Sequence, residues 1–244
     1  MNETIAMSGQ TIGEIVALDY RAADVFEKRK IDFCCQGNRL LKDVCDEKQI
    51  PIADLLKDLE NALNFNKSKI DYQSWALDVL ATHIQTTHHA YVEKQIPVIK
   101  QYLRKICDVH GDKHPELYEI EKLFNVSAGE FTMHMKKEEM ILFPFIRRMV
   151  NAQARGEKVE SPQFGTIENP VEMMMHDHTV EGKRFLKISE LSSGYTPPED
   201  GCNTYKVTYA LLKEFEEDMH LHIHLENNIL FPKSIELEKQ MNKG

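Results

Sequence analysis

The stretch His134-Met-Lys-Lys-Glu138-Glu-Met-Ile-Leu-Phe-Pro144 returns later in the chain as His222-Ile-His-Leu-Glu226-Asn-Asn-Ile-Leu-Phe-Pro232. Histidine, a glutamate four residues on, and Ile-Leu-Phe-Pro keep the same spacing in two copies that begin 88 residues apart. On an α-helix, residues four apart lie on the same face, one turn from each other. Each copy therefore offers one imidazole and one carboxylate to the same point, and two such helices facing each other would form a two-metal centre.

Two further histidines extend the repeat. His89 lies 45 residues before His134, and His176 lies 46 residues before His222. Each gap leaves room for half a helix, a loop and half a helix. The spacing predicts an all-α fold in which four antiparallel helices with short connections form a bundle. Residues at mid-height of such a bundle converge in its core, where bundles build metal sites.

The register of the histidines must be chosen where several lie close together. His176 is preferred to His178 because it preserves the offset between the two halves. His89 is preferred to His88 for the same reason, although this offset tolerates a slip of one residue. In the second copy only His222 has a glutamate four residues on.

The composition restricts the class of protein. The 244 residues are 42% hydrophobic, which permits a sizeable core, and carry a net charge of −9. An acidic chain argues against nucleic acid or an anionic membrane as a partner, because both require a basic surface. No apolar run reaches membrane-spanning length, and the N-terminus lacks a secretion signal. Five cysteines without a disulfide-scaffold pattern are typical of reduced thiols, so we expect a cytoplasmic protein.

The helical patterns divide the chain into two parts. Residues 11–63 are expected to form several short helices, followed by a polar linker at 64–74. Long helical patterns without competing strand segments then cover residues 75–106, 116–152, 169–192 and 203–239. We predict a small helical N-terminal domain at 1–66 and a four-helix bundle at 67–244.

The donor types favour iron over other metals. Ferritin-like proteins use paired Glu-x-x-His ligands, whereas this chain has one such motif, Glu217-x-x-His220, without a partner set. A zinc-protease motif is absent, and the set lacks the thiolates of structural zinc sites. Mixed imidazole and carboxylate ligation suits iron or manganese, and the richness in imidazole favours iron. If both glutamates bridge two ions together with an oxide or hydroxide, each ion keeps an open position for O2 or NO.

Adjacent Cys34 and Cys35 precede an expected helix start at Asn38. The positive end of that helix would lower a thiol pKa. The pair is a candidate for redox chemistry, for transient binding of metal or NO, or for a link between subunits; the alternative is two small core residues. The remaining cysteines are expected to be buried packing residues: Cys45, Cys107 and Cys202.

These motifs, with the segment Asp-Phe-Cys34-Cys35-Gln-Gly, closely resemble the RIC (repair of iron centres) proteins over essentially the whole chain. The resemblance implies a hemerythrin-like four-helix bundle behind a small cysteine-bearing domain. It also implies two non-haem iron ions with oxo or hydroxo and carboxylate bridges. The implied ligands, with both glutamates as bridges, are His89, His134, Glu138, His176, His222 and Glu226. Oxygen-carrying hemerythrins are similar but use an additional histidine and an aspartate in place of one glutamate.

The resemblance implies a stress protein that restores iron-sulfur clusters damaged by nitric oxide or oxidation, by delivering iron or by handling NO. Its expected partners are damaged iron-sulfur proteins, with NO or O2 as small ligands, no nucleic acid and no membrane; a homodimer through the N-terminal domain is one option. Two alternatives stay open. One is a hemerythrin-like sensor that binds O2 or NO, and the other is a di-iron enzyme that reduces NO or scavenges peroxide.

Overall fold

The computed structural model describes residues 7, 9–63 and 70–243. Within these residues the named elements are all helical, and the β structure is limited to an isolated bridge between Thr11 and Leu40. The predicted all-α class is therefore confirmed. No helix in the described part of the chain has the length and apolar character needed to cross a membrane.

Short helices build the N-terminal part of the chain. They are α2 (Ile12–Leu18), α3 (Ala22–Lys28), α4 (Leu41–Lys48) and α5 (Ile52–Leu63). Thr11 and Glu14 start α2 with a reciprocal capping box, in which each side chain accepts a hydrogen bond from the other residue's backbone N–H. Helix α5 presents Leu55 and Leu59 to the core, one turn apart. The predicted domain boundary between residues 66 and 67 lies outside the described residues.

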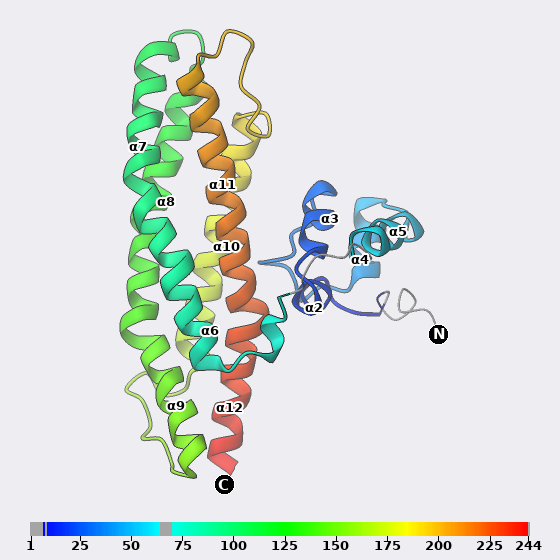
Figure 1. Cartoon of the computed structure of the whole chain (residues 1–244), viewed down its shortest axis with the longest axis vertical. Coiled ribbons are helices and arrows are strands. Elements are labelled where there is room, and N and C mark those ends of the chain that lie inside the picture. Colours follow the sequence, from blue (N-terminus) through cyan, green and yellow to red (C-terminus); the bar gives the residue numbers. More distant parts are fainter. Residues whose placement is uncertain (1–6, 8, 64–69, 244) are drawn as a thin grey trace.

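Long helices build the second part, and three of its four rods contain a π-helical segment. A short 3-10 helix, η1 (Tyr72–Ser74), precedes the rods. The first rod is α6 (Leu77–His83), η2 (Ile84–His89) and α7 (Ala90–His110), and the second is α8 (Glu116–Lys137), η3 (Glu138–Leu142) and α9 (Phe143–Arg155). The third is α10 (Glu168–Leu191), and the fourth is α11 (Asn203–Leu225), η4 (Glu226–Leu230) and α12 (Phe231–Lys243). Helices α7 and α10 each pack against both α8 and α11, so the four enclose a common core (Figure 1). Phe124, Phe185 and Phe215 pack together in this core, with ring centroids 5.4–6.4 Å apart.

Two of the three π-helical turns, η3 and η4, include the Ile-Leu of the repeated Ile-Leu-Phe-Pro segments. The N–H of Phe143 donates to the carbonyl of Glu138 five residues back, and Phe231 repeats this bond to Glu226. The proline that follows each phenylalanine has no N–H, so it cannot restore the ordinary i to i−4 bond at the next position. Each helix therefore continues through a widened turn that begins at the glutamate of the motif. Such turns are frequent at functional sites.

The small domain lies against the bundle at α11 and η4 (Figure 1). Asn228 of η4 fits between Gly13 and Gly37, whose backbones join through a 2.7 Å hydrogen bond. A Cβ at either glycine would lie only 2.5–2.6 Å from Oδ1 of Asn228. Only glycine permits this close approach, so the two parts of the chain are fitted to each other at the level of single atoms.

Candidate metal centre

Two groups of buried histidines and glutamates meet inside the bundle. The first group consists of His89, Glu138, His222 and Glu226, and the second of His134, Glu138, His178 and Glu226. Within each group the nitrogen and oxygen atoms that could bind a metal all lie within 4.8 Å of one another. Both carboxylates belong to both groups, so the two groups form one continuous site.

Glu138 lies between two histidines from different helices. Its Oε1 is 3.3 Å from Nε2 of His134, one turn earlier on α8. Its Oε2 is 3.5 Å from Nε2 of His89, which closes η2. The two oxygens of one carboxylate thus face different imidazoles.

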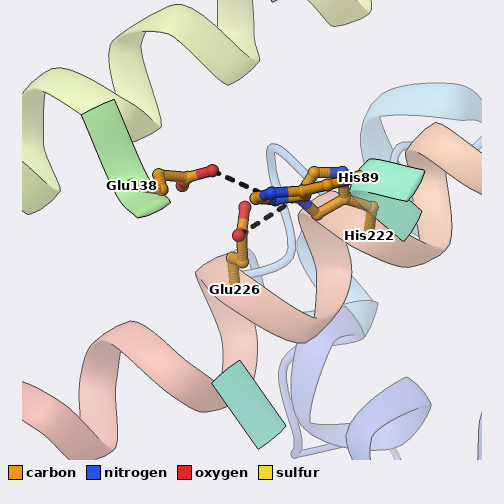
Figure 2. A group of neighbouring side chains, drawn as sticks. All are labelled: His89, Glu138, His222 and Glu226. Atoms are coloured by element: carbon orange, nitrogen blue, oxygen red, sulfur yellow. Dashed lines mark ion pairs between the residues drawn. The ribbon is translucent and has the colours of Figure 1, made fainter. Parts of the chain in front are cut away.

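Glu226 repeats this arrangement on the opposite side. Oε1 of Glu226 is 3.1 Å from Nε2 of His222, and Oε2 is 3.2 Å from Nε2 of His178 on α10. Figure 2 shows the rings of His89 and His222 side by side, directed at the two carboxylates; their centroids are 4.9 Å apart. Each carboxylate therefore faces one histidine nitrogen with each of its two oxygens.

The polar atoms of the site fit a metal better than they fit one another. Both oxygens of Glu138 and of Glu226, and Nε2 of His89 and His222, are buried without a hydrogen-bond partner. Nε2 of His134 and Nε2 of His178 lie only 2.9 Å apart. Two ligand nitrogens at right angles on one ion, with bonds of about 2.1 Å, would lie about 3 Å apart. Because unpaired buried polar atoms are costly, the donor set is best explained by bound metal.

Hydrogen bonds on the far side of the rings orient three of the four histidines. Nδ1 of His89 lies 2.9 Å from Glu139, and Nδ1 of His134 lies 3.3 Å from Asp177. Nδ1 of His178 lies 2.8 Å from Oδ1 of Asn227. A proton on each Nδ1 leaves the Nε2 lone pair directed into the site, which is the usual support of metal-bound histidine.

The pKa values reflect a competition between burial and charge. Burial alone would lower the pKa of His134, but the charge of Glu138 and the hydrogen bond to Asp177 raise it to about 10. Burial dominates at His222 and lowers its pKa. At Glu226, burial opposes ionisation, but His222 and His178 outweigh it and hold the pKa well below its usual range. Without metal, the site therefore holds ionised carboxylate beside a protonated His134.

The structure corrects one predicted ligand. His176 is exposed and belongs to neither group, whereas His178 is fully buried and belongs to the second. Positions two residues apart on a helix point in nearly opposite directions. The sequence does contain the correct signal, a stripe with alternating spacings of three and four residues that includes position 178 and excludes 176. Its buried members on α10 are Val171, Met174, His178, Glu181, Phe185 and Ile188.

The other five predicted donors are brought together: His89, His134, Glu138, His222 and Glu226. The alternative His88 instead faces Asp218, with Nδ1 2.9 Å from Oδ1. The residues that orient the rings were not foreseen. The sequence offered one clue to them: Glu139 and Asn227 directly follow the two glutamates of the repeat.

Cys34 and Cys35 lie on the loop between α3 and α4, beside α10. The Sγ of Cys35 donates to the carbonyl of His178 at 3.4 Å. The expected lowering of a thiol pKa is wrong for Cys34, whose pKa is raised by its hydrogen bond with Cys35 and by burial. Helix α4 begins at Leu41 rather than at Asn38, so its positive end lies farther along the chain than expected.

The expectation that Cys202 is a buried packing residue is also wrong. Cys202 is exposed at the N-cap of α11, 3.2 Å from Nε2 of His110. The backbone N–H of Tyr205 and the His110 ring lower its pKa to about 7. Cys45 and Cys107 are buried, as expected.

Comparison with known proteins agrees with this geometry. Residues 80–234 match the family described as the hemerythrin HHE cation binding domain. Residues 8–63 match a domain of unknown function, DUF542. The first match covers the metal centre, and the second covers the loop with the cysteine pair.

Relatives extend over nearly the whole chain. The iron-sulfur cluster repair protein ScdA of Staphylococcus haemolyticus is 29% identical and covers 91% of this chain and 96% of its own. The iron-sulfur cluster repair protein YtfE is 30% identical in Pectobacterium atrosepticum, covering 95% and 99%, and 31% identical in Yersinia pseudotuberculosis, covering 93% and 96%. The chain therefore belongs to the family of iron-sulfur cluster repair proteins, the RIC family, with a hemerythrin-like domain behind a small helical domain.

Proposed function

We propose that this protein repairs iron-sulfur clusters damaged by nitrosative or oxidative stress, and that it does so by delivering iron held between its four long helices. Its relatives carry the name of cluster repair proteins. The clients are damaged iron-sulfur proteins. All five cysteines are free, which supports action in the reducing cytoplasm.

The observation that carries the proposal is the pair of carboxylates shared by two donor groups. His89 and His222 would hold one iron ion, and His134 and His178 would hold a second. Glu138 and Glu226, which belong to both groups, would serve both ions. Iron bound here supplies further coordination positions for small ligands such as NO or O2.

The donors of the site suit an iron ion that is bound and later released to a client protein. Each group offers an ion only two histidines and the two shared carboxylates, and neither group contains a thiolate. Mixed imidazole and carboxylate ligation binds iron(II) without the permanence of an all-sulfur site.

The test supplies the protein, loaded with isotopically labelled iron, to an enzyme whose iron-sulfur cluster has been damaged by NO or peroxide. We expect recovered activity together with labelled iron in the repaired cluster. A chain with Glu138→Gln and Glu226→Gln should give neither.

A His176→Ala chain is the matched control, since His176 is exposed and outside both groups. It should repair as well as the parent. Recovery without labelled iron in the cluster would overturn iron delivery and point to removal of NO. Reversible gas binding with no recovery would instead identify a sensor.

A further inference from the structure

A third group of potential metal donors lies on the loop between α3 and α4. Asp32, Cys34 and Cys35 place one ligand atom each within 4.8 Å of the others. The two sulfurs are 3.6 Å apart, and Sγ of Cys34 is 3.4 Å from Oδ1 of Asp32. None of these residues belongs to the His/Glu centre.

The spacing of the three donors is that of one small ion. Two thiolates bound tetrahedrally with bonds of about 2.3 Å would have sulfurs about 3.8 Å apart, and a thiolate and a carboxylate oxygen about 3.5 Å. A disulfide would require the sulfurs to lie at about 2.05 Å. The observed distances are close to the first arrangement and far from the second.

The alternative role of Asp32 is to cap the turn. Its Oδ1 accepts from the N–H of Cys34 at 3.1 Å and from that of Cys35 at 2.8 Å. Both bonds go to Oδ1, whereas an ionised carboxylate offers about four acceptor positions over its two oxygens. They hold the carboxylate beside the two sulfurs, so the cap preorganises the donor group.

The bundle holds the loop in this conformation. Asn227 donates to the carbonyl of Cys34 at 3.2 Å, and Asn228 donates to that of Phe33 at 3.3 Å. On α10, Gly182 makes room for Cys35, because a Cβ there would lie 3.2 Å from its Sγ. The donors therefore need little rearrangement to bind an ion.

One side chain connects this loop to the His/Glu centre. The amide of Asn227 meets Nδ1 of His178 through Oδ1 and the carbonyl of Cys34 through Nδ2. The His/Glu donors are buried, whereas Asp32 is exposed and Cys35 is half-buried. The loop thus lies between the buried His/Glu centre and the solvent.

We propose that Asp32, Cys34 and Cys35 form a mononuclear binding site for a thiophilic divalent cation. In the cell this site receives iron(II) from the His/Glu centre and passes it to the damaged cluster. The transfer role rests on the proposed iron delivery; the binding site does not. Iron enters and leaves as iron(II), so no electron is exchanged. The two thiols release their protons to water when the ion binds, and they regain them when it leaves.

Cobalt(II) is the probe, because its thiolate complexes absorb strongly by charge transfer from sulfur to metal. The full chain is first loaded with iron and then titrated with cobalt(II). We expect one further equivalent to bind with this absorption. A Cys34→Ser/Cys35→Ser chain should lose it, and a Cys202→Ser chain, which removes an exposed thiol elsewhere, should keep it.

Asp32→Asn gives a sharper test, since asparagine can still cap the turn but supplies no charge. Cobalt affinity should fall by roughly tenfold or more, because even the loss of a group that only orients a metal ligand costs about this much. Absence of the sulfur absorption, or its persistence in the double serine chain, would overturn the site. An unchanged cobalt(II) affinity in the Asp32→Asn chain would show that Asp32 is not a ligand and would overturn the three-donor site.

A chain with Glu138→Gln and Glu226→Gln separates this site from the proposed function. It should still bind cobalt(II) with the sulfur absorption, although it no longer repairs clusters. Conversely, Asp32→Asn should keep the iron of the His/Glu centre and slow its transfer to a damaged cluster. Iron transfer at the parental rate would overturn the proposal that this site passes iron(II) to the damaged cluster.

Discussion

At the scale of single residues, the site depends on which face of a helix each histidine occupies. His176 and His178 differ by two positions, yet one is exposed and the other lies at the centre of the bundle. The offset between the two halves favoured the wrong one. The half that contains His89 is not an exact spacing template for the half that contains His178.

The first prediction uses this pair. His178→Ala should remove most of the metal bound by the second donor group, because Nε2 of His178 is lost from beside His134 and Glu226. His176→Ala should leave the metal content unchanged. Elemental analysis of both purified variants checks this; equal iron in the two would contradict the register.

The second prediction concerns Cys202. An ordinary thiol becomes reactive thiolate near pH 9, whereas the pKa of Cys202 is lowered to about 7. A lowered pKa means that thiolate is present over a wider pH range, so alkylation by iodoacetamide should reach half its maximal rate near pH 7. His110→Ala should move this midpoint upwards. A Cys202→Ser chain identifies the signal, and a midpoint near pH 9 in the parent would refute the assignment.

At the scale of elements, the sequence specifies the four long rods well. The expected helices at 116–152 and 169–192 correspond to α8–α9 and α10, which span Glu116–Arg155 and Glu168–Leu191. Heptad-like apolar spacing makes these helices visible without tertiary information. The π-helical turns η3 and η4 were not predicted, because a helical pattern that passes through Phe-Pro does not distinguish a kink from a widened turn.

Ring orientation could not be predicted for a different reason. Asp177 and Asn227 belong to rods that are distant in sequence from at least one of their partners, so their contacts arise only when the helices pack. The docking of the cysteine loop on α10 likewise depends on Gly182, which carries no helical signal of its own.

The third prediction tests the buried stripe of α10. Phe185 is fully buried against Phe124 and Phe215, while neighbouring Leu186 is exposed. Phe185→Ala should lower the free energy of unfolding by about 3–5 kcal/mol, from lost burial and the cavity left behind. Leu186→Ala should change it by less than about 0.5 kcal/mol. Urea unfolding of the two variants measures this, and equal losses would contradict the orientation of the helix.

At the scale of the whole molecule, the small N-terminal domain packs against the bundle close to the His/Glu centre. The bundle encloses the His/Glu donors, and the small domain covers it with a loop that carries a thiol pair. Asn227 and Asn228 of η4 connect the two through hydrogen bonds to the loop. The repeated motif therefore supplies the metal centre and, in its second copy, the docking point for the other domain.

The fourth prediction is that acid weakens metal binding. The pKa of His134 is raised to about 10 without metal, so at neutral pH an ion must displace its proton. Lowering the pH strengthens this competition, and affinity should fall by about tenfold per pH unit for each proton displaced. Asp177→Asn removes a carboxylate that raises the pKa of His134 but leaves every donor of the site in place, so it should make the affinity at neutral pH less sensitive to acid. Iron(II) affinity that is constant between about pH 6.5 and 8 would contradict this.

The central claim is that two ions share Glu138 and Glu226, and iron per chain tests it most directly. The measurement uses a Cys34→Ser/Cys35→Ser chain, so that only the His/Glu centre is counted. The two donor groups predict two irons per polypeptide in this chain, and almost none after Glu138→Gln and Glu226→Gln are added. A single iron per polypeptide, or undiminished iron without the two carboxylates, would contradict the account.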